Sequence, residues 1–145
     1  MGLESINFFF SSEEKIEYKI ASNKYITYNE GRKYVYKNNS DFWIDLEFYD
    51  SYSLSLRITL CNPQDSVLKA LFDLLLFLFS FKEGKLIDMC TKQAYTIYNE
   101  EVKEALKKSY LNKKMIFQEM YGDYTEAISS ENFYKKQGEI GSIKQ

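Results

Sequence analysis

The chain has 145 residues, a length that suits one domain and allows a substantial core. Hydrophobic residues make up 45% of it and charged residues 28%, as is ordinary for a folded soluble protein. The formal net charge is −2, so the chain as a whole has no general attraction to nucleic acid. Because no basic region precedes an apolar stretch at the start, we expect no signal peptide.

Strand patterns dominate the first sixty residues. Residues 6–10 form a short apolar run that predicts a strand, whereas residues 15–20 alternate in a way that leaves helix and strand both open. Turn-like segments, the first of which contains Gly31, then separate further strands. These strands are predicted at residues 25–28, 33–37, 42–49 and 54–60. Neighbours joined by such short turns pair antiparallel, so we expect a meander.

An apolar helix is predicted to follow the meander. Asn62 is a suitable N-cap, Pro63 suits the first helical position, and Gly84 follows the end. Hydrophobic residues crowd positions 67–81 on nearly all sides, so the helix needs wide cover, which the apolar face of the sheet can supply. A membrane span needs roughly 20 apolar residues, so we interpret this shorter, interrupted run as a core helix.

The last third predicts a hairpin and a second helix. Residues 85–89 and 95–98 have the hairpin pattern, and the helix begins at Asn99 with glutamates in its first turn. Its apolar stripe consists of Val102, Leu106, Tyr110 and Phe117. Lys103, Lys107 and Lys114 fall within about 40° of one another on a helical wheel, a ridge typical of a solvated face and too short to predict nucleic-acid binding.

Beyond the second helix the pattern weakens. Residues 129–136 suggest a short helix, and residues 137–145 a frayed tail. The predicted fold is therefore a single α+β domain spanning residues 1–136, in which an antiparallel meander packs against two main α-helices.

The residue types argue against most enzymes. The chain has no histidine, which removes the commonest general base and a common metal ligand, and it has no glycine-rich phosphate loop. Cys61 and Cys90 lie 29 positions apart, which predicts two reduced thiols of a cytoplasmic protein and neither a zinc site nor a disulfide. We expect no metal, no cofactor and no catalytic residue. Carboxylate chemistry stays open, because Asp45 and Glu47 project about 6–7 Å apart from one strand face.

One strand carries an unusual polar face. Its alternation places one side of residues 42–49 in the core, and on the other side Trp43, Asp45, Glu47 and Tyr49. Residues 41–50 contain four acids and no base. Two interpretations stay open. In the first, helices cover both faces and the acids pair with lysines. In the second, the row is an exposed surface that binds a basic partner through aromatic anchors and carboxylates.

The order of elements resembles that of a known group of proteins. A strand meander, the segment SLSLRITLCNP leading into an apolar helix, and GKLIDMCTKQAY as strand and turn are similar to the immunity proteins of bacterial polymorphic toxin and contact-dependent inhibition systems. The resemblance implies a cytoplasmic protein that binds a cognate toxin domain and blocks its active site or an exosite. Two other hypotheses are kept: an adaptor or subunit of a homo-oligomer or larger complex, and a carboxylate-dependent enzyme.

Overall fold

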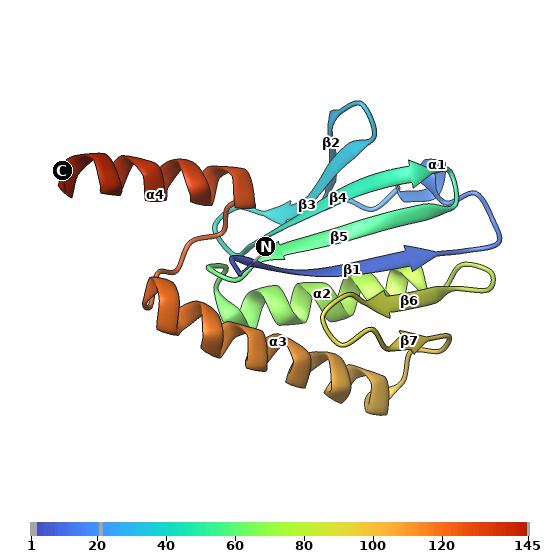
Figure 1. Ribbon diagram of the computed structural model, residues 1–145. Coiled ribbons are helices and arrows are strands. Elements are labelled where there is room, and N and C mark those ends of the chain that lie inside the picture. Colours follow the sequence, from blue (N-terminus) through green and yellow to red (C-terminus); the bar gives the residue numbers. More distant parts are fainter. Residues whose placement is uncertain (1–2, 21, 145) are drawn as a thin grey trace.

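The computed structural model describes residues 3–20 and 22–144, with side chains placed as far as residue 138. Within this part, four helices accompany a seven-stranded antiparallel sheet of order β2-β3-β4-β5-β1-β6-β7 (Figure 1). The strands are β1 (Ser5–Ser11), β2 (Ile26–Glu30), β3 (Lys33–Asn38), β4 (Phe42–Asp50), β5 (Ser53–Thr59), β6 (Lys85–Asp88) and β7 (Ala94–Tyr95). The helices are α1 (Glu17–Ile20), α2 (Gln64–Leu78), α3 (Glu100–Tyr121) and α4 (Ser130–Lys144). The predicted α+β class is confirmed.

The predicted meander accounts for β2 to β5, each of which pairs with the next strand along the chain. Gly31 occupies the β2–β3 turn with φ 53°, a left-handed conformation that glycine adopts without strain. The first strand, β1, lies on the far side of β5 and joins the meander to β6. Its register sets Phe8 opposite Leu56, which in turn faces Leu46 on β4, so the apolar residues of three strands meet on one face.

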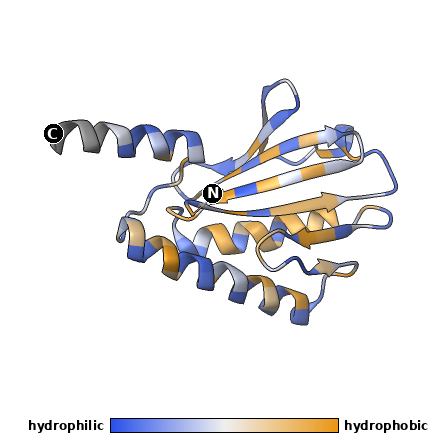
Figure 2. Cartoon of the chain, viewed as in Figure 1, coloured by the Kyte–Doolittle hydropathy of each residue, from blue (hydrophilic) through white to orange (hydrophobic). Residues whose placement is uncertain are grey.

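That apolar face is covered by helices. In Figure 1, α2 lies beneath the central strands and α3 runs beside it, and in Figure 2 the hydrophobic colouring follows α2. The buried residues of α2 share one side of the helix, within about 160° of arc: Val67, Leu68, Ala70, Leu71, Leu74, Leu75 and Leu78. Leu76 on the opposite side is 65% exposed, so the cover that the sequence predicts on nearly all sides is not found there. The predicted stripe of α3 is also buried: Val102, Leu106, Tyr110 and Phe117. None of the helices in the described part of the chain combines the length and apolar character that a membrane crossing requires.

The start of α2 differs from the prediction. Pro63, not Asn62, is the N-cap, and no side chain caps the helix. The Asn62 side chain is buried and holds two strand ends instead. It accepts a hydrogen bond from the Trp43 backbone N–H at 2.8 Å and donates one to the Thr59 carbonyl at 2.7 Å. Burial favours this use of the amide, because it satisfies backbone groups that would otherwise lack partners.

Other helix boundaries shift as well. The ambiguous residues 15–20 contribute the short α1, and α2 ends at Leu78 rather than near Gly84. Asn99 caps α3 as predicted, with its side chain accepting from the Val102 N–H at 2.9 Å. The last helix, α4, continues to Lys144 through most of the segment that the sequence analysis treats as a tail, and Gln145 lies outside the described residues.

The predicted lysine ridge on α3 is wrong at Lys114. This side chain is buried, its Nζ donates to the Leu60 carbonyl, and it lies 5.3 Å from the centre of the Phe117 ring. Burial lowers the pKa of the Lys114 amine. Lys103 is partly covered and lies over the Phe72 ring, so only Lys107 of the three is fully solvated. The helical wheel shows which residues share a side of α3, but not that the end of β5 covers part of it.

Candidate binding groove

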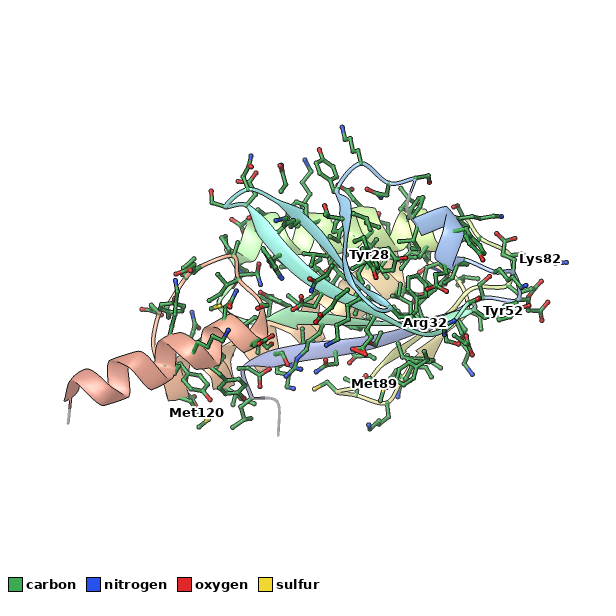
Figure 3. All side chains as sticks on the ribbon, turned by 90° about the horizontal axis from the view of Figure 1, so that it is seen from above. Tyr28, Arg32, Tyr52, Lys82, Met89 and Met120 are labelled. Atoms are coloured by element: carbon green, nitrogen blue, oxygen red, sulfur yellow. The ribbon has the colours of Figure 1, made fainter. Side chains whose placement is uncertain are left out.

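The face of the sheet opposite α2 carries a groove of about 690 Å³, called here the sheet groove. Outward-facing residues of β1, β4 and β5 form its floor. Three other parts of the chain form its walls, represented by Glu30 from the β2–β3 hairpin, Met89 from the turn after β6, and Glu131 from the first turn of α4. Figure 3 shows Met89 close to β1 and Tyr28 on the β2–β3 hairpin.

All four residues singled out on β4 line this groove: Trp43, Asp45, Glu47 and Tyr49. Trp43 and Asp45 are half-buried, whereas Glu47 and Tyr49 are exposed. Two side-chain contacts involve residues of this row. The Trp43 indole Nε1–H donates to Asp45 Oδ1 at 3.0 Å, and the Tyr49 ring packs on Phe9 with centroids 5.4 Å apart.

Helices do not cover this face as they cover the opposite one. The start of α4 reaches it at one end, where the Ser130 and Thr59 hydroxyls lie 3.0 Å apart and Lys135 also lines the groove. Tyr49, at 71% exposure, shows that the other end of the row is open to solvent. Glu47 and Tyr49 therefore lie on an exposed surface, whereas Trp43 and Asp45 are partly covered.

The groove is not acidic, although the β4 row is. Register places Arg57 of β5 opposite Asp45, and Lys33 of β3 opposite Glu47. The Lys37 ammonium lies 4.8 Å from the centre of the Trp43 ring. Among the lining residues the charges balance: Glu30, Asp45, Glu47 and Glu131 against Lys33, Arg57, Lys92 and Lys135. Residues 41–50 contain no base, but the strands that pair with them place Lys33 and Arg57 opposite their acids.

A buried carboxylate behind the groove escaped the sequence analysis. The Glu4 side chain is fully buried, accepts from Arg57 Nη2 at 2.9 Å and from the Tyr134 hydroxyl at 2.6 Å. Burial by itself raises the pKa of Glu4, but hydrogen bonds from Ser5, Tyr134 and Arg57 outweigh it and hold the pKa at about 2. No local pattern marks Glu4, because its partners come from β5 and α4.

The Asp45 carboxyl has the opposite electrostatic character. Burial raises its pKa, and the hydrogen bond from Trp43 and the charge of Arg57 only partly oppose that effect. A carboxylate that has lost water without gaining a full set of donors is a strong acceptor for a ligand group. Asp45 is therefore an acceptor in the groove that a ligand donor can satisfy further.

A second hollow of about 490 Å³ lies at the end of α2, away from the predicted row. Its lining mixes polar and apolar groups, and its wall includes the nearly parallel rings of Phe79 and Tyr98, 5.9 Å apart. Leu76 and Ile97 beside it are 65% and 61% exposed. The sequence analysis did not identify this hollow, because its two sides are distant in the sequence.

The chemistry available in the sheet groove is recognition by charge, hydrogen bonds and aromatic rings. Within residues 3–20 and 22–144, no group of three or more acidic, cysteine or histidine side chains is arranged to hold a metal ion. The chain matches no protein-family model, no curated protein and no solved structure. The groove itself is thus the basis for a functional proposal.

Proposed function

We propose that the chain is a non-catalytic protein-binding domain that engages its partner through the sheet groove. The observation that carries the proposal is the position of Trp43, Asp45, Glu47 and Tyr49, which all line one groove on the open side of the sheet. Tryptophan and tyrosine at the centre of a concave surface are favoured anchors of protein interfaces. The surrounding charges of both signs suit a polar rim that selects a partner by charge pattern.

The partner that we propose is a toxin domain, which the protein binds and neutralises in the cytoplasm. This part rests on the similarity of the strand meander, the SLSLRITLCNP segment and the GKLIDMCTKQAY segment to bacterial immunity proteins. An adaptor or a subunit of a homo-oligomer would use the same groove for a different partner. A full-length pull-down from the native host, followed by identification of the bound protein, distinguishes these cases.

One observation favours a second candidate, a carboxylate-dependent enzyme. Asp45 and Glu47 both line a groove of about 690 Å³, and burial raises the pKa of Asp45, as suits a general acid. The protein-binding proposal is preferred because Trp43 already donates to Asp45 and Glu47 is exposed, so no enclosed reaction site forms around the pair.

The central test measures binding to the captured partner by surface plasmon resonance at two salt concentrations. Trp43→Ala should speed dissociation and cost about 2 kcal/mol or more, since it removes a half-buried aromatic anchor. Asp45→Lys combined with Glu47→Lys should slow association with a basic partner and flatten its salt dependence.

The matched control is Tyr18→Ala, because Tyr18 is 81% exposed on α1 and does not line the groove. It should leave the kinetics unchanged, and circular dichroism should show that all variants are folded. Unaltered kinetics in both folded groove variants would move the interface elsewhere. The hollow beside Leu76 and Ile97 is then the next surface to test, because Lys114 is buried and the α3 ridge is incomplete.

A further inference from the structure

Asp45 and Arg57 are opposite each other but do not form an ion pair. They are register partners on β4 and β5, and both side chains line the sheet groove. Unlike charges in this position commonly pair across a sheet. Among the described residues, however, no contact within 4.0 Å joins the two charged groups.

The cause is competition from Glu4. Arg57 turns away from Asp45 so that its Nη2 donates to Glu4 Oε2 at 2.9 Å and its Nε to the Ser5 hydroxyl at 3.3 Å. A fully buried carboxylate needs a cation more than a half-buried one, because it has no water to replace the lost partner. Arg57 is therefore engaged by Glu4 and Ser5, although its side chain remains 45% exposed.

Among the described residues, Asp45 accepts one side-chain hydrogen bond, from the Trp43 indole. The other charges that act on it are those of Glu131 on α4, which opposes its ionisation, and Lys33 on β3, which favours it. In the described part of the chain, Lys33 makes no ion pair with Asp45 within 4.0 Å. The groove thus presents the Asp45 carboxylate, which is partly desolvated and can accept further hydrogen bonds from a cationic donor.

We infer that the sheet groove receives a basic side chain of the protein partner, an arginine, whose guanidinium pairs with the Asp45 carboxylate against the Trp43 ring. This inference rests on the proposed protein-binding function. The planar guanidinium matches a carboxylate through two parallel donors and stacks on aromatic faces. The Lys37 ammonium already lies 4.8 Å from the centre of the Trp43 ring, and the arriving guanidinium takes its place there. Glu47, two residues along the same face, adds a second acceptor at the mouth of the groove.

The chain carries its own reporter for this test. Trp43 is the only tryptophan, so its indole Nε1–H gives a single signal in a nitrogen–proton correlation spectrum, and that proton is bonded to Asp45. The full chain is titrated with N-acetyl-arginine methylamide, and in parallel with N-acetyl-citrulline methylamide, which has the same shape but no charge. The arginine compound should shift the indole signal in a saturable way. The citrulline compound should bind at least about tenfold more weakly than the arginine compound, since a charge-assisted hydrogen bond is lost.

Asp45→Asn is the decisive variant, because its amide oxygen can still accept from the Trp43 indole while the charge is removed. It should weaken the arginine compound about tenfold. Asp73→Asn serves as the matched control, since Asp73 is exposed on α2, on the other side of the sheet. Equal binding of both compounds, no saturable shift with the arginine compound, or an unaffected Asp45→Asn would overturn the inference.

The same variants measured against the captured protein partner separate this inference from the proposed function. If Trp43→Ala weakens partner binding and Asp45→Asn does not, the groove is the interface but the arginine assignment is wrong. If no groove variant alters partner binding, the proposed function is wrong, whatever the arginine compound does.

Discussion

Glu4 joins three elements through one carboxylate. It stands just ahead of β1, receives Arg57 from β5, and receives the Tyr134 hydroxyl from α4. Because Arg57 and Tyr134 compensate the burial, the carboxylate is stable as the anion, with a pKa of about 2. The same contact decides the state of the groove, since it draws Arg57 away from Asp45. The buried Glu4 thereby leaves the half-buried Asp45 without an ion pair to Arg57.

Glu4 should also make stability depend on pH. Its folded pKa of about 2 lies below the ordinary 4.5, so its contribution is present above pH 4.5 and is lost as pH falls toward 2. Because Arg57 is partly exposed and screened, we expect Glu4→Gln to cost roughly 2–3 kcal/mol at pH 7. The cost should shrink at pH 3. Denaturant unfolding at both pH values measures it, with the exposed Glu13→Gln as control. Unfolding curves that stay the same distance apart at both pH values would contradict the prediction.

Among the elements, α4 depends most on a few contacts. Phe133 is fully buried, and its ring lies 5.6, 5.0 and 5.9 Å from the rings of Phe117, Tyr121 and Tyr124. The Ser130–Thr59 contact fixes the first turn at the edge of the sheet groove. In Figure 1 the rest of the helix extends away from the body of the molecule. The groove wall that α4 forms is thus held mainly by its first two turns.

Phe133→Ala should loosen the part of α4 that lines the sheet groove. Truncating a fully buried phenylalanine costs about 3–5 kcal/mol, so the free energy of unfolding should fall or α4 should detach locally. Hydrogen exchange should then be faster along α4 than along the central strands, and denaturant unfolding gives the total loss. Met115→Ala on α3 is the control, because Met115 is 61% exposed. Equal stability and exchange in the two variants would show that Phe133 does not anchor α4.

At the scale of the whole molecule, the two cysteines lie in different surroundings and are not joined to each other. The Cys61 thiol is buried and donates to the Glu126 carbonyl at 3.2 Å, and burial raises its pKa to about 12. Cys90 is exposed on the turn after β6. One core between the sheet and its helices supplies the stability, and its members come from β1 through α4.

We therefore expect neither a reductant nor a metal chelator to move the unfolding curve. A thiol reagent applied to the folded protein should modify Cys90 rapidly and Cys61 only after unfolding, since a buried, protonated thiol is a poor nucleophile. Mass spectrometry of the native and denatured protein measures both sites. A loss of stability with either additive would show that a disulfide or a metal supports the fold. Rapid labelling of Cys61 in the native state would show that this thiol is accessible.

Much of the fold follows from local patterns in the sequence. Alternation in β4 and β5 assigns their inward and outward residues, Asn99 marks the start of α3, and the apolar run of α2 predicts a core helix, although Leu76 on its outer side is exposed. These features depend on neighbours within a few positions, where backbone periodicity and capping act. The same alternation places Trp43, Asp45, Glu47 and Tyr49 on one outward face.

Only the tertiary structure decides what surrounds that face. Arg57 lies 53 positions from Glu4, and Tyr134 lies 130 positions from it, so no local pattern relates them. Long-range packing likewise buries Lys114, moves Asn62 from a helix cap to the strand ends, and brings α4 to the groove. The physical reason is that each such partner is chosen by competition for burial and charge among segments that meet only in the folded chain.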